Sequence, residues 1–447
     1  MAPFYWRPIY QLILSKYHLF HSSPFYRVPT MYDQIYENQI LNWLEQRVGV
    51  EHFSPGLDRL RPLFDPLAKR FLQQGVKIVT IAGSNGKGEC AHALANLLDQ
   101  GGISYTMWTS PHILTIRERF QHQGKLISYP ELFSTIKEGY LEATNQGVVL
   151  SFYELLFYVF CRWSLDQNRS WAIFEVGLGG RLDAVNLFNA NLVAVTSISR
   201  EHQEILGDSF RSILQEKLGI CRQEVPVTTT LELGYLRVIT KKYCKRHNIP
   251  WRDLFESSLL HYCDNFSVRN RALAQVLFGQ ICDLPLPKER RELLAAVEES
   301  SAHYQGRMES WSWQQRECLF IGAHNLDGLR KQEQLIKSDP RSNKIDHLIF
   351  SLSRRPQKEL TNCIKQIAFS TGLAKRIVIT SFVHARSEDH QVLQTISQQY
   401  APFLEFSYDY ASYLQQHSRP GERILFTGSY YFIGEVQKFM LQAPATN

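Results

Sequence analysis

Nearly continuous apolar runs rich in β-branched residues recur along this chain of 447 residues, and amphipathic stretches separate them. This alternation is typical of a parallel β-sheet with helices on both faces, because strands that are covered on both sides carry apolar side chains on both. In the first part of the chain the predicted strands are VKIVTIAG (76–83), SYTMWTS (104–110), WAIFEVGL (171–178), NLVAVTSIS (191–199) and VPVTTT (225–230). In the last part they are ECLFIGA (317–323), IDHLIFSLS (345–353), RIVITSFV (376–383) and ERILFTGS (422–429).

The length of the chain indicates more than one hydrophobic core. A helical region near 265–300 separates the two sets of strands, and the break between them falls around Ser301–Gly306. We therefore expect a large N-terminal α/β domain with a parallel sheet over 31–300 and a smaller C-terminal Rossmann-like domain over 301–447.

Residues 1–30 are predicted to be a separate N-terminal extension, with no acidic side chain but many aromatic and basic ones. One interpretation of this segment is a targeting helix or a helix that lies on a membrane surface. The other is that translation starts at Met31, just ahead of the helix-like segment YENQILNWLEQRV, and we favour this second interpretation.

The composition excludes several classes of protein. The net charge is +6 and the basic residues are scattered, which argues against a protein dedicated to nucleic acid. The eight cysteines lie far apart and form no CxxC pair or zinc pattern, which favours a reducing, cytoplasmic location. No stretch approaches the roughly 18 apolar residues that a membrane-spanning helix needs, so we expect no integral membrane contact.

A glycine-rich loop joins the first predicted strand to the helical segment ECAHALANLLDQ. Its residues are Gly83, Ser84, Asn85, Gly86, Lys87 and Gly88. Glycines let the backbone N–H groups approach a polyphosphate, the helix offers its positive end, and the lysine reaches the outer phosphates. The spacing differs from the common GxxxxGK[ST] loop. A simple turn is the alternative, but the lysine at the helix entrance favours nucleotide binding.

The sequence GSNGKG of this loop resembles the GTNGKG loop of folylpolyglutamate synthases. Further stretches resemble motifs of that family in the same order: TSPHILTIRERF (109–120), EVGLGGRLDAVN (175–186), HQEILG…EKLGI (202–220) and FTGSYYFIGEV (426–436). From about Met31 onward, the chain is identified as a divergent member of the folylpolyglutamate and dihydrofolate synthase family, within the Mur ligase superfamily. The resemblance implies a P-loop-type ATPase domain followed by a Rossmann-like ligase domain.

The resemblance also implies an activity, the ATP-dependent joining of L-glutamate to the carboxylate of a folate or pteroate. ATP would phosphorylate the carboxylate, and the α-amine of glutamate would displace phosphate from the acyl phosphate. Such an enzyme would use ATP and Mg²⁺, and we expect a monomer. A ligase for a different acid, or a non-catalytic homologue that binds nucleotides, are the alternatives.

In the family, residues that match Ser110, Glu175 and His202 surround the magnesium ions. Glu175 ends an apolar strand, where an unpaired carboxylate would be costly in a core, so its position favours a cleft at the carboxyl edge of the sheet. The alternative for this carboxylate is a pair with Arg181 or with a helix N-terminus, and either could coexist with metal binding.

Two further residues near the metal set are assigned through the resemblance. Lys217 matches a lysine that is carbamylated in the family, although a lone lysine on a helix is usually a solvated surface residue. Asp183 matches an aspartate near the folate and acyl-phosphate site, and its alternative is a residue that caps the turn after Gly179 and Gly180.

In the second half of the chain, Asn270 resembles an asparagine that contacts adenine, and Arg307 resembles an arginine that reaches the phosphates of ATP. Their alternatives are a helix cap and an ordinary surface charge. His324 and Asn325, in IGAHNLDG, resemble the family's DGAHNP, and we place His324 in the catalytic set with Lys87, Lys217 and Asp183.

Several positions depart from the family pattern. Acidic residues are missing at Ile321 and in SLSRRPQ (351–357), and Leu326 replaces a proline. The other departures are Glu89 for a serine, Glu201 for an aspartate, Ser267 for a glutamine and Arg271 for an alanine. The carboxylate of Glu89 either repels ATP or faces away and favours the positive end of its helix. These losses motivate the non-catalytic alternative.

Overall fold

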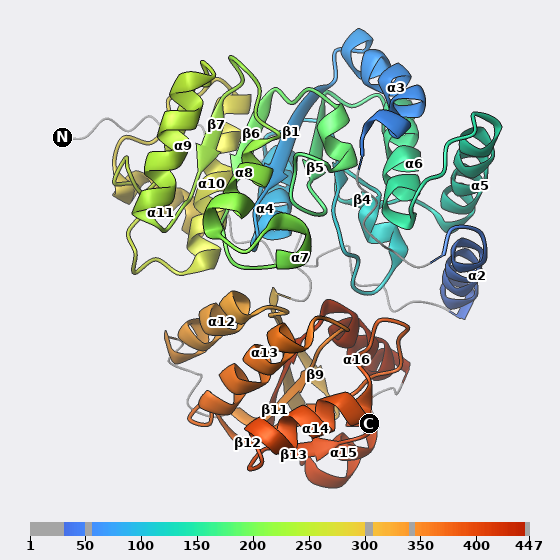
Figure 1. Ribbon diagram of the computed structural model, residues 1–447, viewed down its shortest axis with the longest axis vertical. Helices are drawn as coiled ribbons and strands as arrows, with labels where there is room; N and C mark the ends of the chain where they lie inside the picture. Colours follow the sequence, from blue (N-terminus) through green and yellow to red (C-terminus); the bar gives the residue numbers. More distant parts are fainter. Residues whose placement is uncertain (1–30, 50–55, 300–306, 339–344, 443–447) are drawn as a thin grey trace. The chain divides into compact units, whose positions relative to one another are not determined.

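The structure is a computed structural model that describes residues 31–49, 56–299, 307–338 and 345–442. The chain divides into two compact units (Figure 1). The first unit is Met1–Ser110 with Ile116–Ala302, and the second is Pro111–Thr115 with His303–Asn447. The proposed extension 1–30 and the predicted break at 301–306 lie outside the described residues.

The first unit is built on an eight-stranded sheet in the order β4-β3-β2-β5-β1-β6-β7-β8. All neighbouring pairs from β2 to β8 are parallel, and the two pairs at the other edge, β2 with β3 and β3 with β4, are antiparallel. The strands are β1 (Lys77–Ala82), β2 (Tyr105–Trp108), β3 (Gln121–His122), β4 (Lys125–Leu126), β5 (Trp171–Glu175), β6 (Leu192–Val195), β7 (Val227–Thr229) and β8 (Trp251–Asp253). The centre of the sheet is therefore β1, which lies between β5 and β6.

Helices cover both faces of this sheet (Figure 1). The helices of the first unit are α2 (Met31–Arg47), α3 (Arg61–Gln73), α4 (Lys87–Gln100), α5 (Tyr129–Asn145), α6 (Phe152–Asp166), α7 (Gln203–Leu206), α8 (Phe210–Leu218), α9 (Gly234–Arg246), α10 (Phe266–Ile281) and α11 (Arg290–Glu299). Short 3-10 turns are η1 (Asp58–Leu60), η2 (Ile116–Arg119) and η3 (Ala184–Leu187). Along β1, Val79 and Ile81 pack with α4 and α10, while Ile78 and Ala82 pack with α3 and α6. This two-sided burial explains the continuous apolar runs.

The face under α3 and α6 has an aromatic core. Phe157 of α6 lies at its centre and packs edge-to-face on Phe174 of β5, with ring centroids 5.3 Å apart. The rings of Phe64 and Phe188 contact the Phe157 ring, with centroid distances of 5.8 and 5.7 Å. Aromatic side chains bury large areas, so this cluster is a main source of stability for the first unit.

The second unit has a six-stranded sheet in the order β13-β12-β11-β14-β10-β9, parallel except for β9. Its strands are β9 (Arg307–Trp313), β10 (Arg316–Gly322), β11 (Ile345–Ser351), β12 (Ala374–Thr380), β13 (Glu405–Ser407) and β14 (Arg423–Gly428). Its helices are α12 (Leu326–Ser338), α13 (Gln357–Phe369), α14 (His390–Tyr400), α15 (Tyr410–His417) and α16 (Tyr430–Gln442). Leu348 and Phe350 face the α13 side, and Ile349 faces the α16 side, so this sheet is also buried on both faces.

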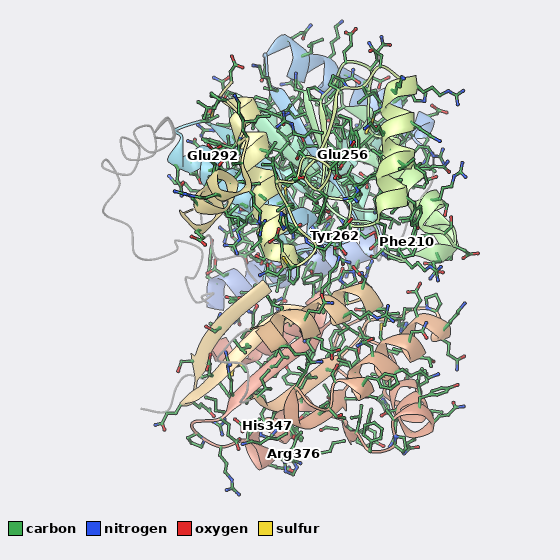
Figure 2. The ribbon with its side chains drawn as sticks, turned by 90° about the vertical axis from the view of Figure 1, so that its left-hand side faces the viewer. Phe210, Glu256, Tyr262, Glu292, His347 and Arg376 are labelled. Atoms are coloured by element: carbon green, nitrogen blue, oxygen red, sulfur yellow. The ribbon has the colours of Figure 1, made fainter. Side chains whose placement is uncertain are left out.

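The amino ends of β11 and β12 carry charged residues that hold the second unit together. His347 and Arg376 are neighbours in register and lie at the same end of this unit (Figure 2). His347 contacts Tyr413 and Glu422 at 2.9 and 3.0 Å, and Arg376 pairs with Glu405. These groups are all paired within the fold, which leaves the carboxyl ends of the strands as the place for a ligand.

The predicted fold class is confirmed, since each predicted strand and each predicted helical stretch is present in the structure. Five strands of the structure are not predicted by apolar runs: β3, β4, β8, β9 and β13. Four of these are two or three residues long, and β9 alternates polar and apolar residues rather than forming an apolar run. Among the described residues, no helix is long and apolar enough to cross a membrane.

Replacing Phe157 by alanine should lower the free energy of unfolding of the first unit by about 3–5 kcal/mol, because it opens a cavity among packed aromatic rings. Chemical denaturation measures this loss. The matched control is Leu72→Ala on α3, where the side chain is 81% exposed and the change should stay within about 0.5 kcal/mol. Equal effects of the two substitutions would contradict the assigned core.

Candidate active site

The glycine-rich loop follows β1 and leads directly into α4, as the sequence predicts. Gly83 and Gly86 have φ angles of 149° and 91°, in the region that favours glycine, and Gly86 is the N-cap of α4. A Cβ on Gly83 would overlap the hydroxyl of Thr196, and one on Gly86 would overlap the amide of Asn270. Both glycines are therefore required by close approaches as well as by backbone conformation.

Hydroxyl groups that follow β6 hold the loop in place. The backbone N–H of Ser84 donates to Ser197 O at 2.8 Å, and the Ser84 hydroxyl accepts from Ser199 N at 2.9 Å. Asn85 O accepts from the hydroxyls of Thr196 and Ser197 at 2.7 and 2.9 Å. The shape of the loop thus depends on hydrogen bonds to the neighbouring strand end.

Lys87 is the first residue of α4, and its side chain folds back over the loop. Its Nζ donates to Gly83 O at 2.9 Å and to Ser84 O at 3.3 Å. The ammonium group therefore lies beside the backbone groups that would surround a phosphate, together with the positive end of α4. Gly88 follows in the first turn of the same helix.

Ser110 and Glu175, two of the three predicted metal-site residues, lie together at the carboxyl ends of β2 and β5. The backbone N–H of Ser110 donates to Glu175 Oε2 at 3.0 Å, and Glu175 is only 2% exposed. The alternative pair of Glu175 with Arg181 is wrong, because Arg181 instead forms a two-pronged contact with Glu216 at 3.0–3.2 Å.

His202, the third predicted metal-site residue, is the N-cap of α7 and has a left-handed backbone with φ of 45°. Its side chain is 48% exposed and lies 3.9 Å from Glu204. Within the described part of the chain, no group of three or more His, Cys, Asp or Glu side chains is arranged to hold a metal ion. Any metal site here must therefore also use hydroxyl groups, waters or phosphate oxygens.

Lys217 is not a solvated surface residue, because its side chain is 1% exposed on the inner side of α8. Its Nζ lies 3.0 Å from Glu201 Oε1, and Glu201 is 7% exposed. Burial lowers the pKa of Lys217, and Glu201 opposes that shift only in part. Burial alone would raise the pKa of Glu201, but the ammonium groups of Lys217 and then Lys87 hold it well below its usual range. Glu201 therefore lies between the two lysines.

Asp183 has a structural role in the fold. It caps η3 through Val185 N at 3.0 Å and accepts from the backbone N–H groups of Gly177 and Leu178, both at 3.0 Å. The hydroxyl of Tyr153 donates to it at 3.0 Å. Burial raises the pKa of this carboxyl to about 6, against the effect of these hydrogen bonds. The turn-capping alternative is thus observed, and a role toward a substrate stays a prediction.

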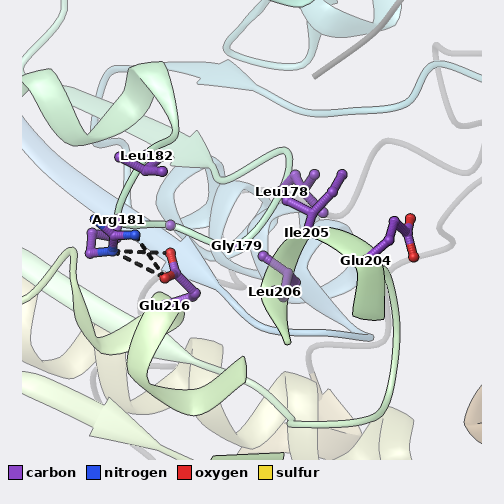
Figure 3. A pocket seen from close by; sticks show the side chains of 9 residues that line it. Leu178, Gly179, Arg181, Leu182, Glu204, Ile205, Leu206 and Glu216 are labelled. Atoms are coloured by element: carbon purple, nitrogen blue, oxygen red, sulfur yellow. Dashed lines mark hydrogen bonds and ion pairs between the residues drawn. The ribbon is translucent and has the colours of Figure 1, made fainter. Parts of the chain in front are cut away.

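A cavity of about 310 Å³ opens beside this turn. Figure 3 shows the Arg181–Glu216 pair on one side and Leu178, Ile205 and Leu206 gathered on the other. Its lining comes from the turn after β5, which carries Asp183, from α7, which follows His202, and from Glu216 of α8. The cavity combines an apolar wall with a charged one, which suits a flat ring with polar edges.

Asn270 lies inside α10 rather than at its end, since the N-cap of α10 is Asn265. The cap alternative for Asn270 is therefore wrong. Its Nδ2 donates to Glu89 Oε2 at 2.7 Å, and Ser267 also donates to Glu89. Glu89 is 8% exposed and faces α10, so it favours the positive end of α4 without projecting into solvent.

The chain is similar to known proteins in sequence and in fold. No protein-family model matches the chain. The dihydrofolate synthase/folylpolyglutamate synthase of Bacillus subtilis is 24% identical over 431 residues, 89% of this chain and 97% of that relative. The corresponding protein of Haemophilus influenzae is 30% identical over 270 residues, 58% of this chain and 57% of that relative.

A solved structure shows the same fold. The folylpolyglutamate synthase of Mycobacterium tuberculosis, complexed with ADP and AMPPCP, superimposes with a TM-score of 0.75 at 18% identity. The match covers 91% of this chain and 98% of that one. The chain is thus similar to the folylpolyglutamate synthase and dihydrofolate synthase family over most of its length. The resemblance read from the sequence motifs is thereby confirmed.

In the second unit, His324 and Asn325 directly follow β10. The His324 ring lies 5.3 Å from that of Tyr430, and Asn325 Oδ1 accepts from Gly328 N at 2.8 Å at the start of α12. Arg307 begins β9, paired with Ile321, and its side chain is outside the described part. His324 thus lies at the carboxyl edge of its sheet, the expected side for a ligand.

The departures from the family motifs serve the packing of the second unit. Ile321 is 5% exposed in its apolar core, and Leu326 begins α12. In 351–357, Arg354 Nε donates to Ser387 O at 3.2 Å, and Arg355 donates to His324 O and to Ser353 O. The arginines here tie neighbouring loops together where the family has carboxylates.

Four residues of the site were not predicted from the sequence: Thr196, Ser197, Ser199 and Tyr153. The hydroxyl residues were visible as TSIS directly after an apolar strand, at the edge where the loop also lies. Tyr153 left no such signal, because it lies on α6 and reaches Gly177 N and Asp183 only through the fold.

Replacing Glu201 by glutamine should lower the free energy of unfolding by about 3–5 kcal/mol, because it leaves the buried Lys217 ammonium without a counter-charge. The double variant with Lys217→Met should recover most of that loss, as chemical denaturation can measure. The matched control is Glu256→Gln, in a surface pair with Lys241, where about 1 kcal/mol or less is expected. A loss that the double variant does not recover would contradict the buried pair.

Proposed function

We propose that this chain is an ATP-dependent ligase that joins L-glutamate to the carboxylate of a folate or pteroate. The observation that carries the proposal is the loop 83–88, held beside Glu175 at the carboxyl edge of one parallel sheet. β1 and β5 are neighbours in that sheet, so the phosphate loop and this carboxylate follow adjacent strands. The full-length similarity to the Bacillus relative supports the same reaction.

The loop and Lys87 would bind the β- and γ-phosphates of ATP. The backbone N–H groups and the positive end of α4 would neutralise phosphate charge, and Lys87 would leave its present contacts with Gly83 O and Ser84 O to reach the outer phosphate. No covalent enzyme nucleophile is required, because the protein acts by positioning the carboxylate of the acceptor and the γ-phosphate.

The residues at the strand ends fit a magnesium ion. Mg²⁺ takes one or two carboxylates and keeps several waters and phosphate oxygens as ligands. Glu175 would supply the carboxylate, with the Ser110 hydroxyl and the His202 imidazole as further ligands. When bound, the ion would neutralise charge on the β- and γ-phosphates.

After phosphoryl transfer, the α-amine of glutamate would attack the acyl phosphate and release phosphate. We assign the acceptor to the cavity beside Asp183, because its apolar wall suits a pteridine ring and its charged wall suits polar ring edges.

In the second unit, Arg307 would contact the phosphates of ATP and His324 would take part in catalysis. Within the first unit, Asn270 would contact the adenine base. The enzyme would act as a cytoplasmic monomer.

The alternative is a homologue that binds ATP but does not ligate. Ile321 inside an apolar core and the arginines of 351–357, which bind backbone carbonyls, favour it, because these positions lack the carboxylates of the family. The two functions differ in one observable, the release of phosphate that depends on both glutamate and a folate.

Incubation with ATP, Mg²⁺, labelled glutamate and a panel of pteroates and folates should give a glutamylated product by mass spectrometry. Lys87→Ala should abolish turnover without unfolding the protein, because the outer phosphate loses its cation, while Lys69→Ala on the exposed side of α3 should match the parent. Turnover by Lys87→Ala at the parental rate would refute the assigned loop. ATP binding without product from any acceptor would favour the alternative.

The carbamylated form of Lys217 is part of this proposal, and it rests on the burial of the amine, which lowers its pKa and so favours the neutral form that reacts with CO₂. The carbamate is anionic, so its formation would replace the ion pair between the Lys217 ammonium and Glu201. With ¹³C-labelled CO₂, the protein should show a carbamate resonance that is missing in Lys217→Arg. The arginine keeps a positive charge but cannot form the carbamate under these conditions. Identical spectra of the two proteins would show that Lys217 remains an amine.

A further inference from the structure

Glu89 is hydrogen-bonded to two residues of α10 that lie one turn apart. Its Oε1 accepts from the hydroxyl of Ser267, and its Oε2 accepts from Asn270 Nδ2 at 2.7 Å. Glu89 is 8% exposed and Asn270 4%, so water does not compete strongly for these contacts. The carboxylate is held between the first turns of α4 and α10, next to the phosphate loop.

Glu89 and Ser267 are both departures from the family pattern, and the structure brings them into contact. A serine is usual at the first position and a glutamine at the second, so the long polar side chain has moved from α10 to α4. Glutamine carries both a donor and an acceptor, whereas a carboxylate only accepts hydrogen bonds. The exchange therefore replaces a side chain near Asn270 that could donate or accept a hydrogen bond with one that can only accept.

The consequence concerns the orientation of the Asn270 amide. A carboxylate can bind only the NH₂ group of an amide, so Glu89 excludes the flipped orientation in which Oδ1 would face it. Within the described residues, no donor forms a hydrogen bond with Oδ1, and the amide lies against Gly86 of the phosphate loop. The amide oxygen is thus left as a fixed acceptor beside the place where a bound nucleotide would continue from its phosphates.

We propose that Glu89 is a positioning residue that makes this site select 6-aminopurine nucleotides by fixing the amide of Asn270. The inference rests on the proposed function, in which Asn270 contacts the base. The 6-amino group of adenine donates a hydrogen bond to the Asn270 oxygen, whereas the 6-oxo group of hypoxanthine brings a second acceptor against it. The carboxylate itself does not touch the nucleotide.

The test measures the dissociation constants of ATP, ITP and purine riboside triphosphate for the full chain by calorimetry. These nucleotides differ at C6, which carries an amino group, an oxo group and hydrogen in turn. The parent should bind ATP on the order of tenfold more tightly than ITP, with purine riboside triphosphate between them. In Glu89→Gln the amide of residue 89 can also donate, so the Asn270 amide can flip and the ATP-to-ITP ratio should fall toward one.

Glu154→Gln is the matched control. Glu154 is 5% exposed, lies in the first turn of α6 and accepts from Ser151 N at 2.8 Å, but α6 is on the opposite face of the sheet. This variant should keep the parental ratio. Asn270→Ala provides a second variant that keeps Glu89 and removes the amide, and its ratio should also fall toward one.

An unchanged ATP-to-ITP ratio in Glu89→Gln overturns the inference, as does an equal weakening of all three nucleotides, which is the result expected of a merely structural residue. If Glu89→Gln does not fold, an unchanged ratio in Asn270→Ala overturns it in the same way. A parent that binds none of the nucleotides refutes the proposed function and, with it, the inference. ATP binding without selectivity refutes the inference alone.

Discussion

The candidate site depends on the parallel pairing of β1 with β5 on one side and β6 on the other. This register places three strand ends side by side, so that the loop after β1 finds the carboxylate of Glu175 on one flank and the hydroxyls of Thr196 and Ser197 on the other. Neither Glu175 nor the two hydroxyl residues are near the loop in sequence. Residues that directly follow β6 form hydrogen bonds with the backbone of the loop. The remaining N–H groups of the loop and the start of α4 are then left to face a ligand.

The fold was largely predictable because strands buried on both faces have a strong sequence signal. The aromatic rings around Phe157 and the alternation of Val79 and Ile81 with Ile78 belong to that signal. Short edge strands such as β8 and β13 have little apolar surface to bury, so their sequences hardly differ from those of loops. Local composition also cannot reveal that β9 closes the second sheet, because its pairing with β10 is a tertiary interaction.

For the candidate site, the loop residues and Glu175 were predictable from a motif that follows a strand. The burial of Lys217 was not predictable. Polar and apolar residues both precede and follow it in α8, and its counter-charge comes from Glu201, which lies outside that helix. Departures from the family pattern look like losses when each is read alone. In the structure, Glu89 accepts a hydrogen bond from Ser267 and Glu201 accepts one from Lys217, so both residues form contacts between segments that are distant in sequence.

Arg355 shows how three segments of the second unit became dependent on one another. Its guanidinium reaches the backbone of His324 after β10, its backbone N–H donates to Glu388, and the hydroxyls of Ser353 and Ser429 lie 2.6 Å apart. The ends of β10, β11 and β14 are therefore cross-linked by polar contacts into one rigid rim. A shorter side chain at 355 would lose the hydrogen bonds to His324 O and Ser353 O together, which restricts the substitutions that this position tolerates. We expect these segments to change together in related proteins rather than singly.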